Sequence, residues 1–100
     1  MRFTTGTYTG DGAATLVITG VGFQPRFVFI VLQSDFEQDQ IFFKSDQDGL
    51  YAKQIFTSDL RWDVDVIISL DADGFTIGDG STSINLVNCV DLVYAFMCWG

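Results

Sequence analysis

The chain has 100 residues, 48% of them hydrophobic, and its 13 acidic and 5 basic side chains give a net charge of −8. This length suits one domain with a single core, and the composition excludes a disordered tail. The negative charge disfavours binding to nucleic acids and to anionic membranes, because both present phosphate groups.

The N-terminal half consists of short strand patterns separated by turn residues. Residues 3–9 and 14–19 alternate between apolar and polar side chains, and the glycines of 10–12 predict a turn between them. An unbroken apolar run follows over 27–32, with Pro25 shortly before it. An acidic loop then leads to a short predicted strand over 41–44.

The C-terminal half continues in the same way. We predict strands over 50–57, 61–70, 75–77 and 89–99, and a short helical turn at 58–60. No segment has the 3.6-residue apolar period of a long helix. The sequence therefore predicts one all-β domain over residues 1–100, an antiparallel β-sandwich or small barrel of about seven to eight strands.

Two of the predicted strands are apolar on both faces. Residues 27–32 contain no polar side chain, and 89–99 contain few. One face of a sandwich strand normally meets water, so the second face needs a cover from this chain or from a partner. A chain of this size has few residues to spare, and we predict a homo-oligomer or docking on a larger assembly. The candidate interface residues are Phe27, Phe29, Val31, Leu92, Tyr94, Phe96 and Trp99.

The two cysteines, Cys89 and Cys98, fall on one predicted strand. Nine residues of extended chain span roughly 30 Å, whereas a disulfide needs Cα atoms within about 7 Å. We predict two free thiols. Because the chain also lacks histidine, we expect no zinc site and no cofactor.

An acidic turn beginning at Asp71 has part of a calcium-loop pattern, with Asp71, Asp73 and Asp79 as candidate ligands. A glutamate at the twelfth loop position and flanking helices are both missing from the pattern. Asp73-Gly74 between apolar strands is instead typical of a hairpin. We predict a turn here and no metal site.

The sequence contains no recognisable catalytic motif. It has no histidine, no nucleophile elbow and no nucleotide-binding glycine motif, and we predict that the protein is not an enzyme. Flat aromatic side chains could stack on sugar rings, and the candidates are Phe36, Tyr51, Trp62 and Trp99. Packing in a core or an interface is the alternative for each of them.

Four ordered motifs carry a family resemblance. They are GTYTGDG from Gly6, GFQPRFVFI from Gly22, DADGFTIG from Asp71, and an asparagine before Tyr94 and Ala95. Together they resemble a small β-rich domain of tailed-phage virion-surface proteins, found in tail fibres and other structural proteins. The match spans residues 6–99. It departs from the family pattern at Arg26, at 32–33 and at 96–100, so the family's basic and polar contacts do not transfer.

The resemblance implies a structural or adhesive role without catalysis. We expect a capsid decoration or cement protein on the exterior of a bacteriophage virion, made in the host cytoplasm. Its expected partners are further copies of itself and other virion proteins such as the major capsid protein. The alternative is a tail-fibre, tail-tip or spike receptor-binding domain that recognises a host surface glycan, and a third possibility is an accessory carbohydrate-binding domain.

We expect no membrane insertion and no export signal. The N-terminus lacks the apolar segment of a signal peptide, and the longest apolar run, over 27–32, is too short to span a bilayer.

Overall fold

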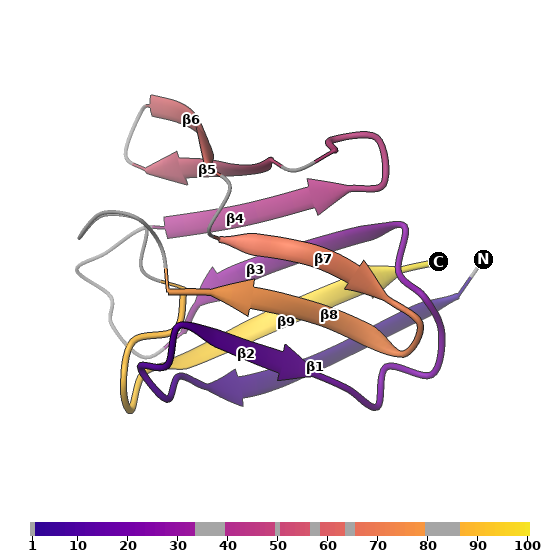
Figure 1. The fold of residues 1–100 in the computed structure, drawn as a ribbon, viewed down its shortest axis with the longest axis horizontal. Coiled ribbons are helices and arrows are strands. Elements are labelled where there is room, and N and C mark those ends of the chain that lie inside the picture. Colours follow the sequence, from indigo (N-terminus) through magenta and orange to yellow (C-terminus); the bar gives the residue numbers. More distant parts are fainter. Residues whose placement is uncertain (1, 34–39, 50, 57–58, 64–65, 80–86) are drawn as a thin grey trace.

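The structure is a computed structural model that describes residues 2–33, 40–49, 51–56, 59–63, 66–79 and 87–100, with residues 40, 54–56 and 59–63 described by their backbone. These residues form nine β-strands and no helix. The strands make two antiparallel sheets that face each other (Figure 1). The predicted all-β sandwich is therefore confirmed.

The larger sheet has six strands in the order β1-β9-β3-β4-β5-β6. Their bounds are β1 Phe3–Thr9, β9 Val93–Trp99, β3 Phe27–Leu32, β4 Gln40–Ser45, β5 Ala52–Phe56 and β6 Asp59–Asp63. The smaller sheet has the order β2-β8-β7, with β2 Thr15–Ile18, β8 Gly74–Gly78 and β7 Ile67–Asp71. It lies over β1, β9 and β3, so that β5 and β6 extend beyond it (Figure 1).

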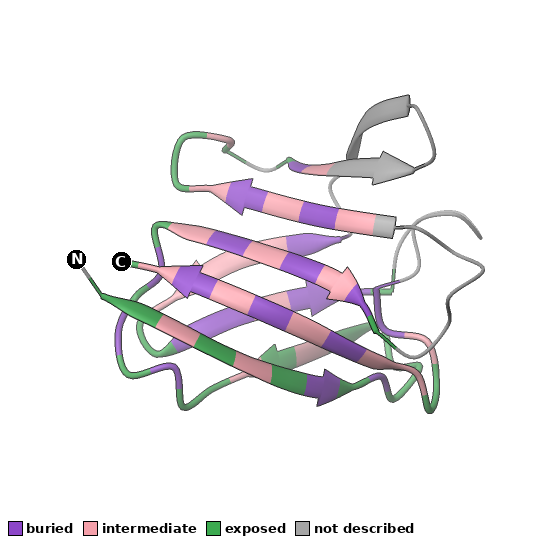
Figure 2. Ribbon diagram, turned by 180° about the vertical axis from the view of Figure 1, so that it is seen from behind, coloured by how far each residue is buried: buried purple, intermediate pink, exposed green. Residues whose placement is uncertain are grey.

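The core lies between the two sheets. Alternate side chains of β3 and β9 are buried and those between them are half-buried, as the striped colouring in Figure 2 shows. This pattern follows from the two-residue period of a strand. The fully buried core side chains come from both sheets and from the segments that connect them: Val28, Ile30, Phe42, Val66, Ile67, Phe75, Ile77, Val87, Tyr94 and Cys98.

The first and last strands lie side by side in the larger sheet. β1 pairs with β9 along its whole length, from Phe3 opposite Trp99 to Thr9 opposite Val93. On its other edge β9 pairs with β3. This arrangement places both strands that were predicted to be apolar on two faces next to each other in the sheet.

The segment 61–70, predicted as one strand, is divided between the two sheets. β6 ends at Asp63 and β7 begins at Ile67. A register shift between Ile67 and Ser69 lets Ile67 point into the core, where unbroken alternation would have placed Ile68. The prediction failed because the chain must change sheets to cover the core, which a local period cannot reveal.

Two smaller corrections concern strand starts. The last strand begins at Val93 and not at residue 89, because Asp91 has a φ of 66°, which an extended strand cannot contain. Asp59 and Leu60, predicted within a helical turn, belong to β6, and Ser58 lies outside the described residues.

Candidate functional site

The larger sheet turns one face away from the smaller sheet, and we call this its outer face. Strand alternation and pairing register assign to it Phe3, Thr5, Thr7 and Thr9 of β1; Val93, Ala95, Met97 and Trp99 of β9; Phe27, Phe29 and Val31 of β3; Ile41, Phe43 and Ser45 of β4; and Lys53 of β5. On β9, β3 and β4 these side chains are half-buried, since their neighbours in the same sheet shield them in part.

A row of aromatic rings crosses the outer face over four strands. The Trp99 ring lies 5.2 Å from Phe3 and 5.3 Å from Phe27, measured between ring centroids. The Phe43 ring lies 6.2 Å from Phe27 and 6.4 Å from Phe29. Each such pair contributes about 0.5–1.5 kcal/mol beyond the area it buries. Phe3, at the edge strand, remains 54% exposed.

The outer face carries very little charge. None of its described side chains is a carboxylate, although the whole chain has 13 acidic residues. Its charged group is Lys53, whose ammonium lies 5.9 Å from the centroid of the Phe43 ring and forms an ion pair with Asp48 at 3.3 Å. The threonines of β1 border the aromatic row on the other side. The face is thus an apolar patch with polar margins on an otherwise acidic molecule.

Four of the predicted interface residues belong to this patch: Phe27, Phe29, Val31 and Trp99. Sequence reasoning missed Phe3, Phe43 and Met97, which complete the patch from neighbouring strands. The alternation within the predicted strands 3–9, 41–44 and 89–99 could have indicated these residues. Only the strand order shows that they lie on the same face as Phe27.

Two of the other three predicted interface residues, Tyr94 and Phe96, are corrected by their burial. Tyr94 stacks on Tyr8 in the core with ring centroids 5.0 Å apart, and Phe96 meets the Phe75 ring edge to face at 5.3 Å. Leu92 packs against the same core. The Tyr94 and Phe96 side chains are therefore buried in the core and are not available to a partner. Leu92 is half-buried, and its place in an interface stays a prediction.

The described part of the structure does not place the sugar-stacking candidates in one cluster. Tyr51 lies in the turn between β4 and β5, with 51% of the residue exposed. Phe36 lies outside the described residues. Trp62 belongs to β6, and its side chain lies outside the described part.

Two of the three calcium candidates, Asp71 and Asp73, stabilise the local fold. Asp71 accepts hydrogen bonds from the hydroxyls of Ser69 at 2.7 Å and Thr76 at 2.6 Å. Asp73 accepts hydrogen bonds from the backbone N–H groups of Gly20 at 3.0 Å and Gly22 at 2.7 Å. Within the described ranges, no group of three or more potential metal ligands occurs.

The predicted turn at the same place is confirmed. Asp71 pairs with Gly74 across the β7–β8 hairpin, which leaves Ala72 and Asp73 as its two turn residues. Asp79 follows β8 and is exposed.

Residues of the first and last motifs of the family resemblance meet at one end of the sandwich, while the DADGFTIG turn lies at the other end. The Tyr8 hydroxyl donates to the carbonyl oxygen of Val87 at 2.8 Å. The side-chain amide of Asn88 donates to Asp11 at 2.7 Å and to the carbonyl oxygen of Ala13 at 3.0 Å. Asn88 is almost fully buried, and hydrogen bonding of this kind is what makes a buried amide tolerable. These hydrogen bonds therefore stabilise the fold.

Both cysteines are free, as predicted. Cys98 is buried on the inner face of β9, opposite Thr4 of β1. Burial raises the pKa of its thiol to about 11, because the thiolate would lose its hydration.

Among the residues whose side chains are described, one charged side chain is buried, which the sequence did not indicate. Lys44 of β4 is only 3% exposed, and its ammonium donates to the carbonyl oxygens of Gly49 and Tyr51. Burial lowers the Lys44 pKa, and the nearby carboxylate of Asp48 opposes that shift. Lys44 lies two residues after Phe42 on β4, so both side chains point to the inner face of the sheet. The two-residue period of the strand could have indicated this burial, but a charged residue is not normally expected in a core.

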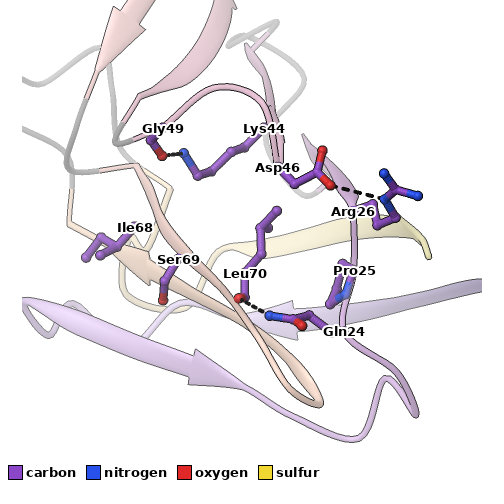
Figure 3. A pocket seen from close by; sticks show the side chains of 9 residues that line it. All are labelled: Gln24, Pro25, Arg26, Lys44, Asp46, Gly49, Ile68, Ser69 and Leu70. Carbon is purple, nitrogen blue, oxygen red and sulfur yellow. Dashed lines mark hydrogen bonds and ion pairs between the residues drawn. The ribbon is translucent and has the colours of Figure 1, made fainter.

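A cleft of about 700 Å³ opens beside Lys44. Figure 3 shows it between β7 on one side and the β4–β5 turn with the segment before β3 on the other. Its lining residues are Gln24, Pro25, Arg26, Lys44, Asp46, Gly49, Ile68, Ser69 and Leu70. Arg26 and Asp46 form an ion pair at 3.1 Å across the mouth, and the Gln24 amide donates to the carbonyl oxygen of Leu70 at 3.0 Å.

No helix in the described part of the chain is long and apolar enough to cross a membrane.

Comparison with known proteins places this sandwich in a family. The chain matches none of the curated proteins and none of the solved structures with which it was compared. A family model does match residues 2–100, almost the entire sandwich. The chain therefore belongs to the family described as a domain of unknown function, DUF7483.

Proposed function

We propose that this domain is a structural protein on the exterior of a tailed-bacteriophage particle, a capsid decoration or cement protein that self-associates through the outer face of its larger sheet. The observation that carries the proposal is the row of partly exposed aromatic rings from Phe3 to Phe43 on that face. Contiguous apolar surface of this kind marks interaction sites in soluble proteins.

A second copy of the chain is the partner that the outer face fits best. With a net charge of −8, two copies repel each other wherever their carboxylates meet. The outer face has no carboxylate among its described residues. Two copies can therefore pack these faces together without opposing acidic groups, and two-fold symmetry would place the same patch on both sides.

The phage assignment is supported by the ordered motifs that resemble virion-surface domains. Their residues include Tyr8, Asn88 and Asp73, which hold the turns of the sandwich by hydrogen bonds. The acidic turns around Asp46 and Asp73 lie at strand ends, outside the aromatic row of the outer face. A decoration protein that docks through one apolar face and exposes acidic turns suits this distribution, with the major capsid protein as the expected further partner.

The self-association is tested by Phe29→Asp, which places a carboxylate in the middle of the outer face. Sedimentation of the wild-type chain should show a concentration-dependent oligomer, and Phe29→Asp should remain monomeric at the same concentration. Val17→Asp is the matched control, since Val17 is 57% exposed on β2 of the other sheet, and it should associate like the wild type. A wild type that stays monomeric at high concentration would refute self-association through this face.

The position on the particle is tested by immunogold labelling of intact virions with an antibody against this chain. Gold over the head supports the decoration role. Gold at the tail tip supports the second candidate, a receptor-binding domain, for which the exposed ring of Tyr51 is the favouring observation. That role further requires saturable binding of the isolated domain to the polysaccharide of the host envelope.

A further inference from the structure

The ammonium of Lys44 is buried without an ion-pair partner among the described residues. Two of its three N–H groups donate to the carbonyl oxygens of Gly49 and Tyr51. The carboxylate that acts on the Lys44 charge, that of Asp48, accepts a hydrogen bond from the backbone of Ser45 and pairs with Lys53. A buried charge in such a setting gains from a counter-ion, and the third N–H group of Lys44 has no hydrogen-bond acceptor among the described residues.

The lining of the adjoining cleft selects the charge of that counter-ion. Its charged side chains are two cations, Lys44 and Arg26, and one carboxylate, that of Asp46. The lining therefore has an excess of one positive charge, on a molecule whose net charge is −8. One excess charge matches a monoanion such as a carboxylate better than a doubly charged phosphate group.

The hydrogen-bond acceptors and apolar residues of the lining indicate which other groups the ligand carries besides its negative charge. The Gln24 side chain uses its amide N–H toward Leu70, which leaves its oxygen to accept a hydrogen bond. Asp46 adds a second acceptor at the mouth, while Pro25 and Ile68 give the cleft apolar walls (Figure 3). The acceptors can take hydroxyl groups of a ligand while the apolar walls contact its C–H groups, and a sugar carries both kinds of group.

We propose that this cleft binds an acidic sugar, with the sugar's carboxylate against the Lys44 ammonium, its hydroxyls donating to Gln24 and Asp46, and the Arg26 guanidinium at the rim. The volume of about 700 Å³ is within the range of small-molecule sites. This inference goes beyond the proposed structural role and does not depend on it, since no residue of the outer face lines the cleft.

The test is a titration of the ¹⁵N-labelled full chain with glucuronate, followed by NMR. We expect the amide signals of Gln24, Arg26, Asp46 and Ser69 to shift with saturation. Glucose, which lacks the carboxylate, should bind about tenfold more weakly or not at all, and acetate, which lacks the hydroxyls, should also bind more weakly; one such contact is worth about this factor.

Two variants and one control locate the site. Lys44→Met keeps the length of the side chain and removes the charge, and it should abolish the glucuronate shifts while the spectrum stays dispersed. Arg26→Gln should raise the Kd about fivefold, and because the Arg26 side chain is 73% exposed, this variant decides the matter if Lys44→Met fails to fold. Arg2→Gln removes an equal charge outside the cleft lining and should leave the Kd unchanged.

Several results would overturn the proposal. They are the absence of shifts at the cleft residues, equal binding of glucose and glucuronate, and an unchanged Kd in Arg26→Gln. Because Phe29→Asp leaves the cleft intact, failure of this site and failure of the outer-face interface are separate outcomes.

Discussion

The Trp99 ring meets the Phe27 ring edge to face, with ring centroids 5.3 Å apart and an angle of 65° between the ring planes. The two residues are directly opposite each other on neighbouring strands, so this contact is fixed by the register of β3 and β9. It lies on the side of the sheet away from the core. Stabilisation of the sheet and formation of an interaction surface therefore use the same side chains.

The two faces of the larger sheet should respond differently to truncation. Phe96→Ala should lower the free energy of unfolding by about 3–5 kcal/mol, because it empties a core position that packs on Phe75 and over Gly6. Phe29→Ala removes an equally large ring from the outer face and should cost less than about 2 kcal/mol. Urea unfolding at a protein concentration low enough to keep the chain monomeric measures both, and equal losses would contradict the assignment of the faces.

Replacing Tyr8 by phenylalanine should destabilise the fold by about 1–3 kcal/mol, since it leaves the buried carbonyl oxygen of Val87 without its hydrogen bond. Tyr51→Phe makes the same chemical change at an exposed ring and should stay within about 0.5 kcal/mol of the wild type. Thermal or urea unfolding of the two variants side by side provides the measurement. A loss of the same size at both sites would show that the Tyr8 hydrogen bond is not responsible.

The Asp73 carboxylate should stabilise the connection between β2 and β3. Asp73→Ala removes its hydrogen bonds to the N–H groups of Gly20 and Gly22 and should cost about 1–2 kcal/mol. Hydrogen exchange of the Gly20 and Gly22 amides should accelerate in the variant. Asp79→Ala removes an exposed carboxylate and controls for the change in net charge. Unchanged exchange at both glycines in Asp73→Ala would be inconsistent with this role.

The buried thiol of Cys98 should make the protein less stable at alkaline pH. Its pKa rises from 9.0 in the unfolded chain to about 11 in the fold, so its contribution is fully present below pH 9. Above that pH the unfolded chain releases the proton first, and stability is lost as the pH rises from 9 toward 11. The free energy of unfolding should therefore fall more steeply over this interval in the wild type than in Cys98→Ala.

The comparison with Cys98→Ala isolates the thiol, because the other groups whose pKa values are shifted remain in both proteins. Among these, Tyr8 and Tyr94 have pKa values raised by burial and should add a similar loss near pH 10 in either protein. Parallel curves for wild type and variant would show that the Cys98 thiol titrates alike in the folded and unfolded chain.

Turns and strand periods were readable from local sequence. The apolar alternation and the glycine and aspartate turns predict an all-β chain, and the hairpin at Ala72 and Asp73 follows from the residues next to it. The same reasoning failed at 61–70, where the chain passes from β6 to β7. The apolar period of the sequence continues through this crossing, whereas in the structure the consecutive residues Val66 and Ile67 are both buried.

The sequence by itself determined that 27–32 and the last strand have two apolar faces, since their side chains alternate to opposite sides whatever the fold. Only the tertiary structure decided which face the smaller sheet covers. It buries Tyr94 and Phe96 and leaves Phe27, Phe29 and Trp99 on the outer face, although all five are aromatic side chains on these two strands. It also buries the charge of Lys44 under the carbonyl oxygens of a turn. These outcomes depend on which distant segments pair and stack, and burial is a property of that arrangement rather than of the local chain.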